Sequence, residues 1–219
     1  MVDRRRRALI GSASAAGLAS AASVGWLVPT ASLAQETVAT PAQTLGPFYP
    51  SSKPAETDSD LTKVGVGAKL AAGDLTHVSG NVFDTRGKPI IGIAVEIWQC
   101  NAFGRYHHPG DTSARTLDPN FQGYGRAITD AGGGYYFRTI KPVPYPGRTP
   151  HIHFRLSGPS IADFSTQLYI AGHPQNDDDG LLRSVRNQRG RDTLLAIFEK
   201  IQGVDEWRAK WDIVIARRA

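Results

Sequence analysis

The chain is poor in cysteine, and this limits its covalent chemistry. Cys100 is the only cysteine among 219 residues, so an internal disulfide bond is impossible even in an oxidising compartment. Its setting in the sequence "EIWQCN" indicates a small buried side chain and not a reactive thiol. Internal repeats and low-complexity tracts are also lacking beyond residue 34, which leaves an ordinary globular domain as the expected organisation.

A strong excess of one charge sign is lacking as well, once the first residues are set aside. The formal net charge is +5, and Arg4 to Arg7 together with Asp3 carry +3 of it. The remaining charge is too small to indicate a surface for nucleic acid. Nucleic acid is therefore not an expected partner.

Residues 1–34 have the composition of an export signal. A basic start is followed by small and apolar residues over 8–28, and the segment closes on the small-residue sequence "ASLA". Arg6 and Arg7, followed by an apolar tripeptide, resemble a twin-arginine signal. A retained membrane anchor is the alternative, but the segment is only weakly hydrophobic, which favours cleavage. We predict a twin-arginine-type signal peptide over 1–34, export to the bacterial periplasm, and no stable membrane insertion after cleavage.

The rest of the chain is predicted to fold as an antiparallel β-sandwich behind an extended arm. Residues 35–76 are rich in Pro, Thr, Ser, Asp and Gly and show little periodicity, which predicts an arm that packs on the domain. Residues 77–219 alternate short apolar stretches with turn sequences, which is typical of a sandwich. The expected strands are 77–84, 90–98, 123–130, 135–140, 151–158, 164–172 and 206–216.

Two local patterns refine the predicted fold. The glycine-rich turn "AGGG" predicts a hairpin between the strands at 123–130 and 135–140. The segment 190–203 carries an apolar stripe at helical spacing and ends in Gly203. It therefore predicts one short helix near the C-terminus of a mainly β protein.

Candidate metal ligands occur in two stretches of the chain. "EIWQCNAFGRYHHPGD" contains Tyr106, and "PYPGRTPHIHF" contains Tyr145, His151 and His153. On a strand, two histidines two residues apart point to the same face and can reach one ion, although such a pair can equally be an ordinary polar face. Zinc favours cysteine and carboxylate beside histidine, and calcium and magnesium favour oxygen cages. This set of tyrosines and histidines therefore suits none of these three metals. Phenolate is a hard anionic ligand that suits ferric iron.

Several motifs together resemble one enzyme family. The two stretches, with "GYGRAITDAGGGYYFRTI" between them and "TQLYIAG" after them, are similar to the intradiol ring-cleavage dioxygenases of the protocatechuate 3,4-, catechol 1,2- and hydroxyquinol 1,2- groups. The resemblance extends from about residue 40 to the C-terminus. It implies a prealbumin-like β-sandwich, with the catalytic domain at 77–219, one Fe(III) per chain and no organic cofactor. It also implies that O2 cleaves a catechol-type ring between the two hydroxyl-bearing carbons, giving a cis,cis-muconate-type diacid.

The same resemblance assigns the iron ligands. Tyr106, Tyr145, His151 and His153 match the family's four protein ligands. Tyr145 and His153 match the axial positions, and Tyr106 and His151 the equatorial ones. The two histidines that directly follow Tyr106 are not expected to bind the metal, because four ligands already fill the site.

The resemblance also indicates residues that face the substrate. Arg148 matches an arginine that lies against the bound catechol, and Gln167 matches a glutamine near the ring under attack. Tyr145 would act in catalysis by dissociating as a neutral phenol. In "LGPFYP", Pro47 and Phe48 match the pocket wall and are candidate substrate contacts.

The substrate and the class of protein stay open at this stage. The loop between Tyr145 and His151 is short, and Gly147 stands where the protocatechuate type often has a tryptophan. We therefore expect a more open pocket, with catechol, protocatechuate, hydroxyquinol or a larger catechol as candidate substrates. A homo-oligomer is possible, but not the dimer of the catechol enzymes, whose long helical region is not found here. The alternative function is a non-catalytic prealbumin-like binding module.

Overall fold

The computed structural model describes residues 37–54, 56–66 and 69–217. The predicted signal peptide at 1–34 lies outside these residues and stays a prediction, which N-terminal sequencing of the exported protein would test. Within the described ranges, no helix has the length and apolar character needed to cross a membrane.

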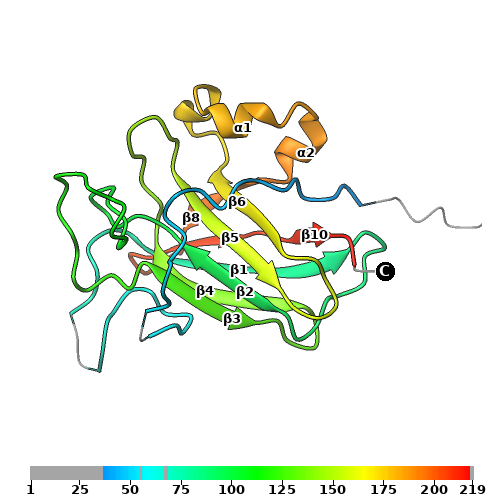
Figure 1. The fold of residues 1–219 in the computed structure, drawn as a ribbon, viewed down its shortest axis with the longest axis horizontal. Helices are drawn as coiled ribbons and strands as arrows, with labels where there is room; N and C mark the ends of the chain where they lie inside the picture. The colour runs from blue at the N-terminus through cyan, green and yellow to red at the C-terminus, as the bar shows by residue number, and fades with distance from the viewer. Residues whose placement is uncertain (1–36, 55, 67–68, 218–219) are drawn as a thin grey trace, which may run out of the picture. The chain divides into compact units, whose positions relative to one another are not determined.

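The described residues form two five-stranded β-sheets with a hydrophobic core between them (Figure 1), which confirms the predicted mainly β sandwich. The first sheet contains β1 (Leu75–Asp84), β4 (Gly134–Ile140), β8 (Phe198–Lys200), β9 (Trp207–Lys210) and β10 (Ile213–Ile215). The second runs in the order β3 (Tyr124–Ile128), β2 (Ala94–Trp98), β5 (His151–Ser157), β6 (Phe164–Ile170) and β7 (Leu195–Ala196). In the first sheet, β4 pairs with one edge of β1, while β9 and β10 pair in parallel with successive halves of its other edge.

The second sheet separates the core from the candidate ligands. Ile152 and Phe154 on β5 are fully buried in the core between the sheets. Because side chains alternate along a strand, His151 and His153 lie on the opposite, outer face of the same sheet. The core therefore fixes the position of β5, and the outer face presents the two histidines.

The predicted hairpin between 123–130 and 135–140 is wrong. β3 pairs with β2, whereas β4 pairs with β1, so the glycine turn connects the two sheets. The turn itself is well defined, because the Asp130 side chain accepts hydrogen bonds from backbone N–H groups within it, and Gly133 adopts a φ of 75°. A tight turn does not determine which strands pair, since that depends on which apolar faces reach the core.

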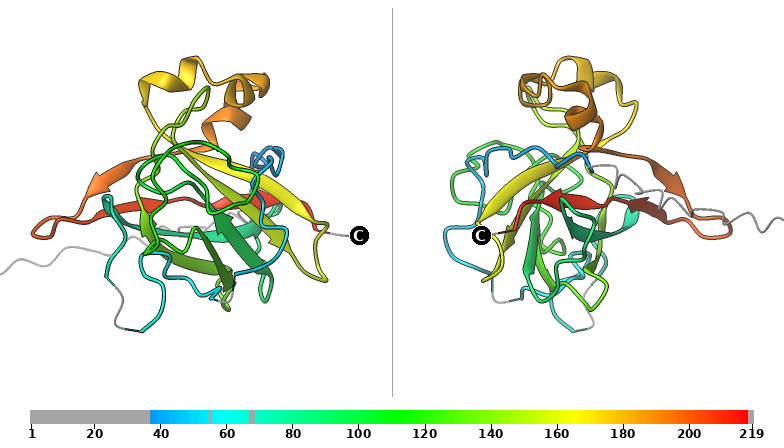
Figure 2. Two further views of the ribbon diagram at one scale, coloured as in Figure 1. Left: turned by 60° about the vertical axis from the view of Figure 1, so that its left-hand side comes forward. Right: turned by 90° about the vertical axis from the view of Figure 1, so that its right-hand side faces the viewer.

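The short helix near the C-terminus is present, but not over 190–203. A 3-10 turn, η1 (Pro174–Asp177), is followed by α1 (Gly180–Ser184) and α2 (Gln188–Asp192), and these helices lie at one end of the molecule in every view (Figures 1 and 2). Beyond α2 the chain becomes β7 and β8. Ala196 and Phe198 are buried there, while Ile197 between them is 73% exposed. That alternation is the period of a strand, so the helical interpretation of this apolar segment is wrong.

The segment from residue 37 to residue 53 crosses the outer face of the second sheet, where Figure 1 shows it in blue over β5 and β6. The Gln43 backbone N–H donates to the Ser165 carbonyl oxygen at 2.8 Å. Farther along, the Tyr49 hydroxyl donates to Glu96 on β2 at 2.9 Å. The arm therefore covers the face that carries His151 and His153.

Candidate metal centre

Two histidines of β5 meet on the outer face of the second sheet, close to the arm. His151 and His153 are each only 2% exposed, and their Nε2 atoms lie 3.2 Å apart. Gly46 of the arm approaches so closely that a Cβ atom there would lie 3.1 Å from Cε1 of His153. The two Nε2 atoms are thus placed to share one bound ion, and a glycine with a φ of 72° suits the close approach of the arm at this point.

The contacts of His151 define its proton arrangement. Its Nδ1 lies 2.7 Å from the Thr149 carbonyl oxygen, and since a carbonyl only accepts, we assign the proton to Nδ1 and the free lone pair to Nε2. Burial, followed by the charge of Arg148, lowers the pKa of His151 to about 3. Burial also lowers the pKa of His153 well below its usual value. Both rings are therefore neutral at neutral pH, which is the form that binds a metal.

Two tyrosine rings stand next to the histidines. The Tyr106 ring centroid lies 6.2 Å from that of His153, and the Tyr145 centroid lies 5.4 Å from that of His151. The buried hydroxyl of Tyr106 has no hydrogen-bond partner among the described residues. Burial raises the pKa of Tyr106 and of Tyr145 above the usual phenol value, and in Tyr145 it outweighs the opposing charge of Arg148. Neither phenol therefore ionises at neutral pH unless a metal cation binds its oxygen.

The donor atoms of these four residues fit a ferric ion. Two neutral imidazoles supply nitrogen, and two phenols supply oxygen that a trivalent cation would ionise and bind. Such a cation would also satisfy the orphaned hydroxyl of Tyr106. In the part of the chain that the structure describes, no group of three His, Cys, Asp or Glu residues could hold a metal. A metal at this place therefore depends on the tyrosines.

Arg148 and Gln167 lie beside these rings and contact each other. Gln167 is fully buried on β6, directly opposite His153 in the strand register. Its side-chain oxygen accepts a hydrogen bond from Nη2 of Arg148 at 2.6 Å, and Nη1 of Arg148 lies 3.4 Å from the Tyr145 hydroxyl oxygen. The structure thus brings both predicted substrate-facing residues to the histidine pair.

Two aromatic residues of the site were not singled out from the sequence. Trp98 stacks on His153, with ring centroids 4.8 Å apart and planes 9° apart. Tyr169 lies opposite His151 in the register, and its hydroxyl lies 3.1 Å from the Gln167 side-chain oxygen. Strand alternation could have found both, because each occupies the same face as a candidate residue once the pairing of β2, β5 and β6 is known.

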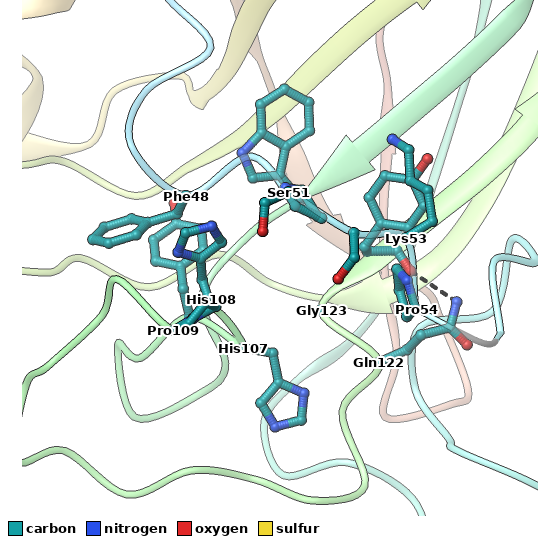
Figure 3. Close-up of a pocket in the computed structure, with 14 residues that line it drawn as sticks. Phe48, Ser51, Lys53, Pro54, His107, His108, Pro109, Gln122 and Gly123 are labelled. Carbon is teal, nitrogen blue, oxygen red and sulfur yellow. Dashed lines mark hydrogen bonds between the residues drawn. The ribbon is translucent and has the colours of Figure 1, made fainter.

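A cavity of about 230 Å³ lies beside Tyr106 (Figure 3). Phe48 lines it and stacks on Tyr106 with ring centroids 4.6 Å apart, so this candidate contact residue lies at the edge of the site. Pro47 is exposed and does not line the cavity. His107 and His108, which were not expected as ligands, are part of its wall, with His108 next to Phe48 in Figure 3.

Comparison with known proteins shows the family to which the chain belongs. A family model described as "Dioxygenase" matches residues 44–216, a range that holds every candidate residue above. The protocatechuate 3,4-dioxygenase beta chain of Burkholderia cepacia is 39% identical over 183 residues, which are 78% of this chain and 77% of that protein. The chain belongs to the intradiol dioxygenase family. Catechol 1,2-dioxygenase of Candida albicans is 29% identical over 198 residues, and the match spans 78% of this chain but 61% of that protein.

Solved structures of the family share the fold. The dioxygenase domain of a dioxygenase and carbohydrate-binding fusion from Streptomyces sp. SirexAA-E superposes with a TM-score of 0.63 at 29% identity, over 82% of this chain and 99% of that one. An intradiol ring-cleavage dioxygenase from Tetranychus urticae superposes with a TM-score of 0.64 at 21% identity, over 82% of this chain and 95% of that one. At this low identity the similarity supports only the shared fold. Membership of this family disfavours the alternative of a non-catalytic binding module.

Proposed function

We propose that the protein is an Fe(III)-dependent intradiol dioxygenase that cleaves a catechol-type ring with O2 to a cis,cis-muconate-type diacid. One observation carries the proposal: two imidazole Nε2 atoms 3.2 Å apart stand beside two tyrosines, one of them with a buried, unpartnered hydroxyl. Tyr106, Tyr145, His151 and His153 would hold the metal. Bound Fe(III) would supply the Lewis acidity and the electron demand that make a catecholate reactive toward O2.

The two tyrosines are inequivalent, and this suits a catechol that must lose its protons on binding. Tyr106 is buried, whereas Tyr145 is only partly buried and lies in the turn before β5. Tyr145 is therefore the residue that can move aside, and its phenolate oxygen would accept one proton from the catechol. Burial favours the neutral phenol that results.

Arg148 and Gln167 would orient the ring and stabilise developing charge. Arginine stays charged at every accessible pH, and its planar guanidinium can lie against an aromatic ring. A fixed positive charge in a largely buried site stabilises negative charge on the substrate far more than it would in water. Gln167, which is hydrogen-bonded to Arg148, would hold that charge in place.

Iron loading tests the proposed function. The purified protein is expected to bind one Fe(III), to turn red-brown through tyrosinate charge transfer, and to consume O2 with catechols while forming a ring-opened diacid. Tyr145→Phe should change the colour and lower kcat/KM by roughly 100-fold or more, the usual effect of a lost proton acceptor. Tyr136→Phe, an exposed tyrosine on β4, is the matched control and should change neither. A protein that stays colourless after iron loading would contradict the proposal.

For the substrate, we propose catechols larger than catechol itself. Gly147 is exposed, has a φ of 78°, and has no atom within 4 Å of the position of a Cβ, so the turn beside Arg148 leaves open space. Steady-state kinetics with catechol, protocatechuate, hydroxyquinol and catechols with bulkier substituents test this. We expect kcat/KM for the bulkier compounds to match or exceed that for catechol. A strict preference for unsubstituted catechol would rule the idea out.

A further inference from the structure

Asp179 is a buried acid that the proposed chemistry does not yet use. It is the last residue of an acidic run in which Asp177 and Asp178 are exposed, yet Asp179 itself is only 1% exposed. A carboxylate taken out of water is costly unless charged or polar groups satisfy it. The burial of this one member of the run therefore requires specific partners.

Both oxygens of Asp179 have such partners. Oδ1 accepts hydrogen bonds from the backbone N–H groups of Leu181 and Leu182, at 3.0 and 2.9 Å, and so caps α1. Oδ2 accepts from Nε of Arg148 at 2.8 Å and from the Thr149 backbone N–H at 3.0 Å. One carboxylate thus joins the helical segment to the turn that carries the candidate arginine.

The contact with Asp179 fixes the plane of the Arg148 guanidinium. The group is rigid and planar, so holding Nε–H in one direction also determines where Nη1 and Nη2 lie. These two nitrogens are the ones near Tyr145 and Gln167. Asp179 contacts the guanidinium through Nε–H alone, which leaves Nη1 and Nη2 free of an acid, and it is the one acid paired with Arg148 in the described residues.

We propose that Asp179 is a positioning residue, which holds Arg148 by its Nε–H so that Nη1 and Nη2 face the catechol. The consequence for turnover depends on the proposed function, whereas the placement of Arg148 does not. Its loss would let the side chain rotate or swing out, and a misplaced charge of this kind lowers the rate without removing a metal ligand.

A double-variant cycle tests the effect on turnover. Asp179→Asn keeps the size of the side chain but removes its charge, and we expect kcat to fall about 10- to 100-fold, with iron content and colour unchanged. In an Arg148→Gln background the same change should lower kcat by less than about 2-fold more, because the arginine through which it acts is gone. Asp177→Asn, which removes an exposed charge from the same run, should have no effect. Equal losses in both backgrounds would overturn the proposal, because a disturbed α1 cap would then be the cause.

A second measurement does not depend on activity, and its first result comes from the wild-type protein. In the wild-type protein, the ¹⁵N-bound Nε–H of Arg148, assigned by its loss in Arg148→Lys, should exchange with water at least about 10-fold more slowly than exposed arginines. Asp179→Asn should abolish this protection, and Asp177→Asn should keep it. Rapid exchange in the wild type would overturn the placement. An absence of ring cleavage with this protection intact would overturn only the proposed function.

Discussion

At the scale of single residues, the buried hydroxyls of Tyr106 and Tyr124 show how the same group serves two purposes. The Tyr124 hydroxyl donates to Glu96 at 2.6 Å, whereas that of Tyr106 has no partner among the described residues. A buried polar group without a partner destabilises a fold by about 1–3 kcal/mol. The unpartnered hydroxyl of Tyr106 is explained if its oxygen is a metal ligand.

Tyr106→Phe should therefore have opposite effects in the two forms of the protein. In the iron-free form we expect the free energy of unfolding to rise by about 1 kcal/mol, because an unsatisfied hydroxyl is removed. Iron affinity should fall, because a ligand is lost. Denaturant unfolding and iron titration measure the two effects. Tyr124→Phe, the matched control, should lower the unfolding free energy by about 1–3 kcal/mol, since Glu96 loses a donor. A loss of stability in iron-free Tyr106→Phe would contradict the assignment.

At the scale of elements, the segment after α2 shows that one apolar pattern can fit both the period of a helix and that of a strand. Residues 194–201 fit a helix by spacing, yet in the structure Phe198 belongs to β8 and pairs with Ala209 of β9. The strand places Ile197 in solvent and Phe198 in the core. A helix would have placed both on one buried face.

Substitutions at these two neighbours distinguish the alternatives. Ile197→Thr should change the free energy of unfolding by no more than about 0.5 kcal/mol, because the side chain is exposed and stays β-branched. Phe198→Ala should lower it by about 3–5 kcal/mol through loss of buried area and a cavity. Denaturant unfolding of both variants is the measurement, and similar losses for the two would favour the helix.

At the scale of the whole molecule, one buried carboxylate ties the arm to the second sheet. Glu96 on β2 accepts hydrogen bonds from Tyr49 and Lys53 of the arm, from Tyr124 on β3 and from Arg155 on β5. Burial by itself would raise the pKa of Glu96, but these hydrogen bonds outweigh it and lower the pKa from 4.5 to about 2. An ionised Glu96 therefore helps to hold the arm that covers the candidate metal centre.

The stability of the protein should follow the ionisation of Glu96. Because its pKa is lower in the folded state, the stabilisation is complete above pH 4.5 and is lost as the pH falls toward 2. We expect a loss of about 2–3 kcal/mol over that range from this group. Glu96→Gln should flatten this part of the pH profile, whereas Glu199→Gln, an exposed acid on β8, should not. Parallel acid-unfolding curves for the wild type and Glu96→Gln would contradict the assignment.

The sequence by itself predicted most of the strands, because alternation depends on local spacing, and its resemblance to one family indicated the candidate ligands. Alternation of apolar and polar residues located β1, β5 and β6 to within a few residues. The spacing of His151 and His153 predicted that both rings lie on one face, and the buried Ile152 between them agrees with this. Family motifs also indicated Arg148 and Gln167 as neighbours of the site.

Only the tertiary structure decided which distant segments meet. It assigned β3 and β4 to different sheets, placed β7 and β8 within the segment predicted as a helix, and exposed Pro47. It also selected Asp179 from three consecutive acids as the partner of Arg148. The physical reason is the same in each case: local periodicity describes a face, but the partner of that face is chosen by the packing of chain segments far apart in sequence.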